Sequence, residues 1–487
     1  MSAVLKKNKR DRQPASQALA RHPGEERVAQ IGQWESTTTG ELCEFITSGS
    51  RDWKSYYSET GAYFIRTQDI NRDHLDLSNA ARVKLPDRVE GKRSRVLPGD
   101  LLITITGANV GKVALVPDQI EEAYVSQSVG LMRLKDKRFA PYLHHYLQSE
   151  ECGRKQVLGS VYGIGRPVLS LQNLRDIPVV LPPLEAQRKI IAEIEKQSTR
   201  LDSGVAALHR VQANLKRYRA AVLKAACEGR LVLTEAELAK TEGRTYETGE
   251  QLLARILADR RKNWHGRGKY KEPAAPDATN LAPLPSGWAW STAEQLSDEN
   301  RSITYGVIKL GTHVIGGVPV LRSSDVRHLR LDPEDVKVIS PDIANGYRRT
   351  FLRGGEVLVT VRGTLGGVTV APTQCAGFNI SREVAMLAFV EPLVAKATAI
   401  FIGSSPLQQW LMQHTKGIAY TGINIETLKK LPIPLPPLME QARIVAEVER
   451  RLSMVEKLEA AVAANLQRAT RLRQSVLHRA FAASATV

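Results

Sequence analysis

Thr47–Tyr57 mixes cationic and aromatic side chains among Gly and Ser, in the sequence TSGSRDWKSYY. Arg51 and Lys54 can neutralise phosphates or donate hydrogen bonds to guanine edges, and Trp53 and Tyr57 can stack on bases or donate hydrogen bonds. We therefore take these four residues as candidate contacts to a nucleic acid. The alternative is a solvated surface loop, and for each residue taken alone the two interpretations stay open.

A second segment, TYGVIKLGTH at 304–313, has flanks that match those of the first segment but different chemistry. It carries Tyr305 and Lys309, which are its candidate contacts. After a strand-like run that occurs twice in the chain, the turn begins with Thr106 in one copy and with Arg362 in the other. Two modules that bind different targets require different side chains at equivalent positions of the same fold.

Arg66 and Arg322 occupy equivalent positions just after an apolar run, in the segments FIRTQDI and VLRSSDV. Each arginine can contact a phosphate. Each can instead form a salt bridge with the aspartate three residues later, Asp69 or Asp325. The sequence leaves both alternatives open.

No catalytic centre is predicted. Gly107–Lys112 superficially resembles a phosphate-binding loop, but it has one residue fewer between its glycines than that motif needs, and Val113 follows the Lys in place of Ser or Thr. Asp87 and Glu90–Lys92 hint at a nuclease site, but the acids are too close together for metal ligands on strands. Motifs such as HExxH, GxSxG and NPPY are absent. We therefore expect a chain without catalytic residues, cofactor or metal.

The elements that hold these residues belong to a large internal repeat. The segment LSLQNLRDIPVVLPPLEAQRKIIAEIE at 169–195 returns as INIETLKKLPIPLPPLMEQARIVAEVE at 423–449. Upstream, GDLLITITGANVG at 99–111 returns as GEVLVTVRGTLGG at 355–367. Two copies of one module in a chain predict a target that itself has two parts.

A long amphipathic helix is predicted after each LPPL run. Pro182 and Pro183 stop the preceding extended segment and are suited to open a helix. Apolar residues then recur every seven positions, at Ile194, Leu201, Leu208, Leu215 and Val222 and at Val448, Val455, Val462, Ala469 and Val476. A seven-residue apolar step kept over this length is typical of coiled-coil packing.

These patterns predict an α+β fold of mixed α/β character, with two globular modules and two long helices. Short strand-like runs broken by Gly, Pro, Asn and Asp indicate the modules. The expected segments are a basic disordered tail (1–28), a first module (29–182), a first long helix (183–230), a linker with a short helix at 249–262 (231–285), a second module (286–436) and a second long helix (437–484).

The formal net charge of +17 predicts a polyanionic partner, although basic tails also raise this number, and 1–30 with 259–271 account for about half of it. The four cysteines are far apart and form no CxxC pair. The basic start lacks the apolar region of a secretory signal, and no apolar run is long enough to span a membrane. A reducing cytoplasm and no membrane partner are therefore expected.

The repeated blocks NLRDIPVVLPPLEAQRKI and TLKKLPIPLPPLMEQARI, each followed by a long helix ending LKRYRAAVLKAACEGRLV or RLRQSVLHRAF, closely resemble the specificity subunit of type I restriction–modification enzymes. GDLLITITG and FIRTQDI also look like that family's recognition domains. The resemblance covers about 30–484. The basic tail and the linker 231–285 depart from the minimal pattern of the family.

The resemblance implies that each module is a target-recognition domain. Each would bind one half of a split, asymmetric site in double-stranded DNA through the major groove. The long helices would pack antiparallel as a coiled coil and fix the gap between the half-sites. The chain would dock two methyltransferase subunits, which bring S-adenosylmethionine and methylate adenine, and motor–nuclease restriction subunits would join for cleavage.

Two other classes of function are weighed against this one. The chain could be the recognition part of a fused methyltransferase or nuclease, but the absent motifs and the lack of spare length weigh against that. It could be a coiled-coil adaptor that binds only proteins, but the charge and the divergent basic and aromatic loops would then be unexplained. The bases recognised and the length of the gap do not follow from the sequence, because base recognition depends on loop geometry and water.

Overall fold

A computed structural model describes residues 34–49, 51, 53–71, 73–86, 91–163, 165–266, 268–277, 279, 281–415 and 422–481. The expected basic tail (1–28) and the last residues of the second helical segment (482–484) lie outside the described residues. The chain divides into two units, residues 1–208 with 464–487, and residues 209–463. Each unit holds one copy of the repeated module and one part of each long helix.

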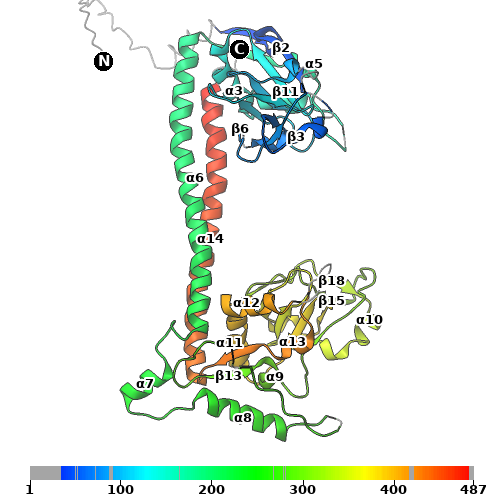
Figure 1. The fold of residues 1–487 in the computed structure, drawn as a ribbon, viewed down its shortest axis with the longest axis vertical. Helices are drawn as coiled ribbons and strands as arrows, with labels where there is room; N and C mark the ends of the chain where they lie inside the picture. The colour runs from blue at the N-terminus through cyan, green and yellow to red at the C-terminus, as the bar shows by residue number, and fades with distance from the viewer. Residues whose placement is uncertain are drawn as a thin grey trace, which may run out of the picture. The chain divides into compact units, whose positions relative to one another are not determined.

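The strands of unit 1 form two four-stranded sheets and two strand pairs (Figure 1). The first sheet is antiparallel, in the order β2 (Cys43–Ser48), β11 (Val129–Leu134), β8 (Leu101–Thr104) and β9 (Val113–Leu115). The second has the order β10 (Ala123–Val125), β4 (Ala62–Ile65), β7 (Ala81–Val83) and β3 (Tyr57–Ser58), and only its β10–β4 pairing is parallel. The pairs are β1 (Glu35–Thr38) with β12 (Pro178–Leu181), and β5 (Ile70–Asn71) with β6 (His74–Leu75).

Strand β8 explains how the module builds its core. Its residues LLIT are all buried. Because side chains alternate along a strand, Leu101 and Ile103 enter one hydrophobic cluster, whereas Leu102 enters another on the opposite face. The first cluster is covered by α3 (Ala140–Gln148), and the second lies against β4 and β10. A run that is apolar at every position is therefore a strand buried on both faces.

Helices complete unit 1. The short helices are α2 (Thr39–Leu42), α4 (Gly153–Gly159) and α5 (Leu171–Arg175), with 3₁₀ turns at Trp53–Tyr56, Thr67–Asp69, Lys92–Ser94 and Lys137–Phe139. Phe481, which is distant in sequence, also belongs to this core. Phe481 lies edge-on to Tyr142 and Tyr146 of α3, with ring centroids 5.5 Å and 5.6 Å apart.

Unit 2 repeats most of this plan, but its second sheet has three strands among the described residues and lacks a counterpart of β3. Its sheets have the orders β14 (Thr304–Tyr305), β22 (Val384–Leu387), β19 (Val357–Thr360), β20 (Val368–Val370), and β18 (Lys337–Ile339), β15 (Val318–Leu321), β21 (Asn379–Ile380). The pairing of β15 with β21 is parallel, as is that of β4 with β10. The strand pairs are β13 (Ala289–Thr292) with β23 (Pro432–Leu435), and β16 (Val326–Arg327) with β17 (Arg330–Leu331). The helices are α9 (Ala293–Leu296), α10 (Pro341–Asn345), α11 (Pro392–Ile402), α12 (Ser405–Gln413) and α13 (Ile425–Lys429), with 3₁₀ turns at Arg348–Thr350 and Thr373–Cys375.

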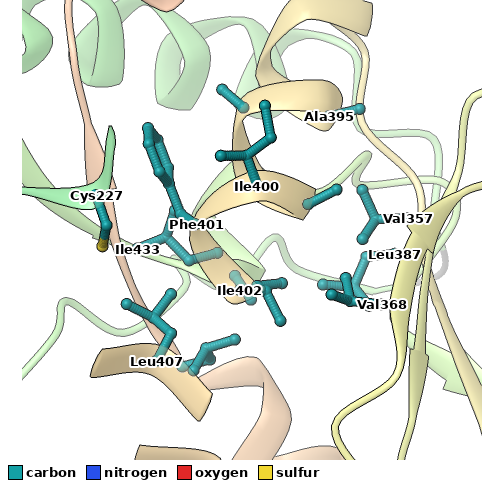
Figure 2. Packing of buried hydrophobic residues seen from close by; sticks show 14 of the residues in the cluster. Cys227, Val357, Val368, Leu387, Ala395, Ile400, Phe401, Ile402, Leu407 and Ile433 are labelled. Carbon is teal, nitrogen blue, oxygen red and sulfur yellow. The ribbon is translucent and has the colours of Figure 1, made fainter. Parts of the chain in front are cut away.

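The core of unit 2 forms around α11. Figure 2 shows Phe401 near Cys227 and Ile433, with Val368 and Leu387 of the sheet on the other side of the helix. All five side chains are at most 5% exposed. Cys227 is the last residue of a long helix, so the core of the module also anchors that helix's end.

Two long helices follow the LPPL runs, α6 (Leu184–Cys227) and α14 (Leu438–Phe481), each of 44 residues. The glutamine that follows each run explains part of the repeated motif. The side-chain amides of Gln187 and Gln441 are buried and donate to the carbonyls of Pro182 and Pro436, at 2.7 Å and 2.8 Å. This bond locks the turn from the last strand into the helix. No helix among the described residues is both long and apolar enough to cross a bilayer.

The two helices contact each other within each unit. In unit 1, Asp202 of α6 forms an ion pair with Arg473 of α14. In unit 2, Arg219 and Glu459 form another, with 3.1 Å between nitrogen and oxygen. Of the residues at the seven-residue step, Ile194, Leu215, Val222, Val448, Val455, Val462 and Ala469 are buried.

The segment between α6 and β13 packs on unit 2. It contains α7 (Glu235–Glu242), which the sequence did not indicate, and α8 (Gly249–Lys262). The amide of Gly249 donates to the carbonyl of Gly287 at 2.7 Å. A Cβ on Gly249 would lie 2.2 Å from the carbonyl oxygen of Leu435, so this close approach requires glycine. The start of α8 is thereby fixed against the module.

Candidate nucleic-acid interface

In unit 1 the candidate loop is anchored by its tryptophan. Trp53 is 6% exposed. Its ring stacks on Phe64 at 5.6 Å and meets the edge of Tyr124 at 5.3 Å. Trp53 therefore belongs to the core of the module, and it holds the 3₁₀ turn on which Lys54 and Tyr56 lie. A stacking contact between Trp53 and a base would require the loop to open.

The neighbouring candidates of this loop face outward. Arg51 and Lys54 are exposed, and Tyr57 is 46% exposed although its ring lies 5.8 Å from that of Phe64. Arg93 lies beside the loop because its Nη2 donates to Oγ1 of Thr47 at 3.2 Å. The structure thus brings three of the four loop candidates onto the surface of one segment, next to a further arginine.

In unit 2 two candidates from separate segments meet. Tyr305 on β14 is 39% exposed, and the guanidinium carbon of Arg362 lies 6.0 Å from the centre of its ring. A guanidinium over an aromatic face at this distance is a cation–π contact. Lys309 is exposed. Arg362 and Thr106 also have equivalent backbone pairings, with Gly422 and Val168, so the two positions correspond in space as well as in sequence.

Arg66 and Arg322 form ion pairs with the nearby aspartates. Nε of Arg66 lies 3.2 Å from Oδ2 of Asp69, and Nε of Arg322 lies 3.3 Å from Oδ2 of Asp325. Both aspartates are buried, and each also accepts the backbone amide of its own arginine at 2.8 Å. Of the two alternatives left open by the sequence, the structure contains the salt bridge, which fixes the turn after β4 and β15. Phosphate contact by either arginine stays a prediction.

The sequence reasoning missed a basic pair that occurs in both copies. Lys92 and Arg93 lie on a 3₁₀ turn in unit 1, and Arg348 and Arg349 lie on the matching turn in unit 2. All four side chains are exposed, while the third residue of each turn, Ser94 or Thr350, is buried. The signal was present in the sequence as KRS and RRT at the offset of the repeat. A feature shared by both copies suits contacts to phosphates, which carry no sequence information.

The described residues contain no group of three or more His, Cys, Asp or Glu arranged to hold a metal ion. Asp87 and Glu90 lie outside the described residues. All four cysteines are free and buried. Burial raises the pKa of the Cys43 thiol to about 12 and that of Cys227 to about 11. Both thiols are therefore protonated at neutral pH and unsuited to act as nucleophiles.

Comparison with known proteins agrees with this arrangement. A family model described as the type I restriction modification DNA specificity domain matches residues 31–203 and 313–462. The specificity subunit of type I restriction enzyme EcoBI of Escherichia coli is 29% identical over 315 residues, which are 64% of this chain and 59% of that protein. The corresponding EcoKI subunit of Escherichia coli K12 is 24% identical over 456 residues, 91% of this chain and 87% of that protein. The match thus spans about three-fifths of the first relative and most of the second.

The same fold occurs in a solved structure. A chain from a structural study of complex assembly and conformational transition in a type I R-M system superposes with a TM-score of 0.56. It is 22% identical in sequence, and the match covers 92% of this chain and 97% of that one. The mixed helix and strand content, with the specificity domain present twice, is therefore a known architecture.

Proposed function

Because the chain belongs to the family of type I restriction modification DNA specificity domains, we propose that it recognises a DNA site made of two different halves. One observation carries this proposal. The order of strands in the first sheet is the same in both modules, but their exposed loop side chains differ, with Arg51, Lys54 and Tyr57 in one and Tyr305 and Arg362 in the other. Two modules with similar strands but different exposed side chains suit two different half-sites.

The contacts are divided by role. Side chains that differ between the copies (Arg51, Lys54 and Tyr57; Tyr305, Lys309 and Arg362, with Thr106 opposite Arg362) contact base edges. The basic pairs that both copies keep, Lys92–Arg93 and Arg348–Arg349, contact phosphates. Trp53 supports the surface from behind, whereas Arg66 and Arg322, held in place by their aspartates, contact phosphates. The exposure of these side chains and the rule that base contacts specify whereas phosphate contacts position support this division.

The long helices serve as the spacer between the two DNA-binding modules. Two ion pairs support an antiparallel coiled coil. The partner on α14 has the higher residue number where the partner on α6 has the lower one, as Asp202–Arg473 and Arg219–Glu459 show. Buried residues at the seven-residue step support the same packing. The proposed modules have the boundaries expected from the sequence, 29–182 and 286–436.

The partners in this proposal are double-stranded DNA, two methyltransferase subunits that bring S-adenosylmethionine, and motor–nuclease restriction subunits. The relatives are named as specificity subunits of type I restriction enzymes, and the structural neighbour comes from a study of complex assembly. The chain itself is non-catalytic and carries no cofactor. Its place is the reducing cytoplasm, where its buried thiols stay free.

The test is differential DNA binding. Arg51→Ala and Arg362→Ala are measured in the assembled methyltransferase against duplexes altered in the first or the second half-site. Each lost base contact should cost about 1–3 kcal/mol and affect one half-site only. Arg188→Ala is the matched control, because Arg188 is an exposed arginine on α6 outside the module. A uniform loss on every duplex would instead assign the two arginines to phosphates, and no loss would place the recognition surface elsewhere.

A further inference from the structure

Unit 2 contains a cavity of about 900 Å³ between the segment after α8 and the second module. One wall comes from the end of α8 and the following segment, including Arg260, Trp264 and Tyr270. The opposite wall comes from residues 297–303, which lead into β14, and from the basic turn with Arg348 and Arg349. The first wall precedes β13, the first strand of the second module.

The cavity is strongly cationic. Its basic lining residues are Arg260, Lys269, Lys271, Arg301, Arg348, Arg349, Arg353 and Lys429, and its acidic ones are Glu294, Asp298 and Glu299. Arg301 pairs with Glu356 at 2.8 Å and Lys429 pairs with Glu294 at 3.4 Å. Within the described part of the chain, the other basic lining residues form no salt bridge. Positive charge therefore exceeds negative charge after the internal pairs are counted.

The most informative group is a buried arginine. Arg260 is 8% exposed, and its Nε and Nη1 have no hydrogen-bond partner among the described residues. Nε1 of Trp264 and the hydroxyl of Tyr270, both buried atoms that line the same cavity, also have none. Buried donors without partners destabilise a fold, most of all when they are charged. A set of such donors around one cavity indicates a ligand that accepts hydrogen bonds.

We propose that this cavity binds the phosphate group of a nucleotide. Guanidinium groups donate in the planar fork that phosphate oxygens accept. The rings of Trp264 and Tyr270, with centroids 5.8 Å apart in an edge-to-face arrangement, offer an aromatic surface for the attached base. The cavity volume lies in the range of small-molecule sites. The phosphate belongs either to a free nucleotide or to a nucleotide unit of a bound DNA strand.

The experiment uses the full chain and separates the two sources. In one arm, ATP and adenosine are titrated by calorimetry at fixed ionic strength. In the other, a short single-stranded oligonucleotide and a duplex without the recognition site are titrated by fluorescence anisotropy. Arg260→Gln and Lys271→Gln should each weaken binding of the phosphate-bearing ligand. For Arg260→Gln the affinity should fall about tenfold, as expected for the loss of a charge-assisted hydrogen bond. Adenosine, which has no phosphate, should bind to neither wild type nor variants.

The matched control is Arg261→Gln. Arg261 neighbours Arg260 in sequence, but its side chain is 65% exposed and pairs with Glu272 outside the cavity lining. This variant should bind like wild type. Loss of ATP binding only in the cavity variants identifies a free nucleotide, and loss of DNA binding only in them identifies a strand. If the three variants behave alike in both arms, the proposal is overturned.

The unfolding temperature of each variant shows whether weaker binding comes from a less stable fold. Without ligand, Arg260→Gln should leave the temperature unchanged or raise it, because a buried charge without a partner is removed. With ligand, the rise seen for wild type should be absent. A fall of the same size with and without ligand would make Arg260 a structural residue and overturn the proposal. Discrimination between half-sites should be unchanged in these variants, so this test does not depend on the proposed function.

Discussion

Trp53 and Tyr57 are aromatic neighbours in one loop with different surroundings. Trp53→Ala removes a ring packed against Phe64 and Tyr124, and we expect it to lower the free energy of unfolding by about 3–5 kcal/mol, the usual cost of deleting a buried large aromatic residue. Tyr57→Ala removes a ring that is 46% exposed, and we expect at most about 1 kcal/mol. Urea unfolding of both variants measures the difference.

The two substitutions should also differ in DNA binding at low temperature, where both variants are folded. Tyr57→Ala should weaken the first half-site, because the surface ring is the one available to DNA. Trp53→Ala should weaken binding of the first half-site only indirectly, through disorder of the loop 47–57. If Tyr57→Ala is the more destabilising change and Trp53→Ala leaves stability intact, the division between support and contact is wrong.

The sequence predicted which kinds of side chain the loop contains better than it predicted which of them are buried or exposed. It indicated that residues 47–57 hold cationic and aromatic groups, and three of these lie on the surface. It did not reveal that Trp53 is buried, because that depends on Phe64 and on Tyr124, which is distant in sequence. It also could not pair Tyr305 with Arg362, because the contact joins β14 to the turn after β19. Such contacts arise from tertiary structure, which local patterns do not encode.

At the scale of elements, helix α3 carries two adjacent histidines, the buried His144 and the partly buried His145. Burial lowers the pKa of His144 to about 3, with a further contribution from the neighbouring His145, whose own pKa is lowered by burial to about 4. His144 lies 3.1 Å from the carbonyl of Asp73 and 2.8 Å from the amide nitrogen of Gln148. Both rings are therefore neutral in the folded module at physiological pH.

Acid should destabilise this element. Because the folded pKa values lie below the ordinary 6.5, the unfolded chain binds protons first as pH falls. The contribution of His144 to stability is fully present above pH 6.5 and is lost progressively down to about pH 3, with about 2 kcal/mol lost by pH 5. Hydrogen exchange of α3 at pH 7 and pH 5, corrected for intrinsic rates, measures the loss. His144→Gln should reduce this dependence, and an unchanged pH profile in that variant would contradict the assignment.

The sequence predicted long elements well and the sheet connections poorly. The LPPL runs and the seven-residue step located both long helices, since their signals repeat over many turns. The parallel pairings β4–β10 and β15–β21 had no local signal, because each joins strands separated by much of a module. The short α7 was missed as well, although Thr234 and Glu237 form a capping box at its start.

For the whole molecule, the spacer proposal gives a direct prediction. Insertion of four residues into the exposed middle of α6 or of α14 should change the gap between half-sites while the bases recognised in each half stay the same. The reason is that the inserted turn changes the helix pair and not the modules. Methylation-aware sequencing of DNA treated with the assembled variant enzyme measures gap and bases together. Altered bases at an unchanged gap would refute the spacer role.

A second prediction at this scale concerns catalysis. The purified chain alone should neither methylate nor cleave DNA, because its sequence has no catalytic motif in either copy. Addition of separately purified methyltransferase subunits with S-adenosylmethionine should give adenine methylation. Turnover by the lone chain that survives removal of contaminating methyltransferase would favour a fused enzyme. Salt-insensitive or absent DNA binding would favour a protein-only adaptor.

The contact of Phe481 with Tyr142 and Tyr146 has a consequence for biosynthesis. Phe481 completes the core of the first unit, yet all of unit 2 separates it in sequence from the strands of that core. The core of unit 1 can therefore be completed only after residues 209–463 of unit 2 have been synthesised. A premature stop codon shortly before the codon for Phe481 would therefore damage the first module, whose own strands are encoded upstream of unit 2.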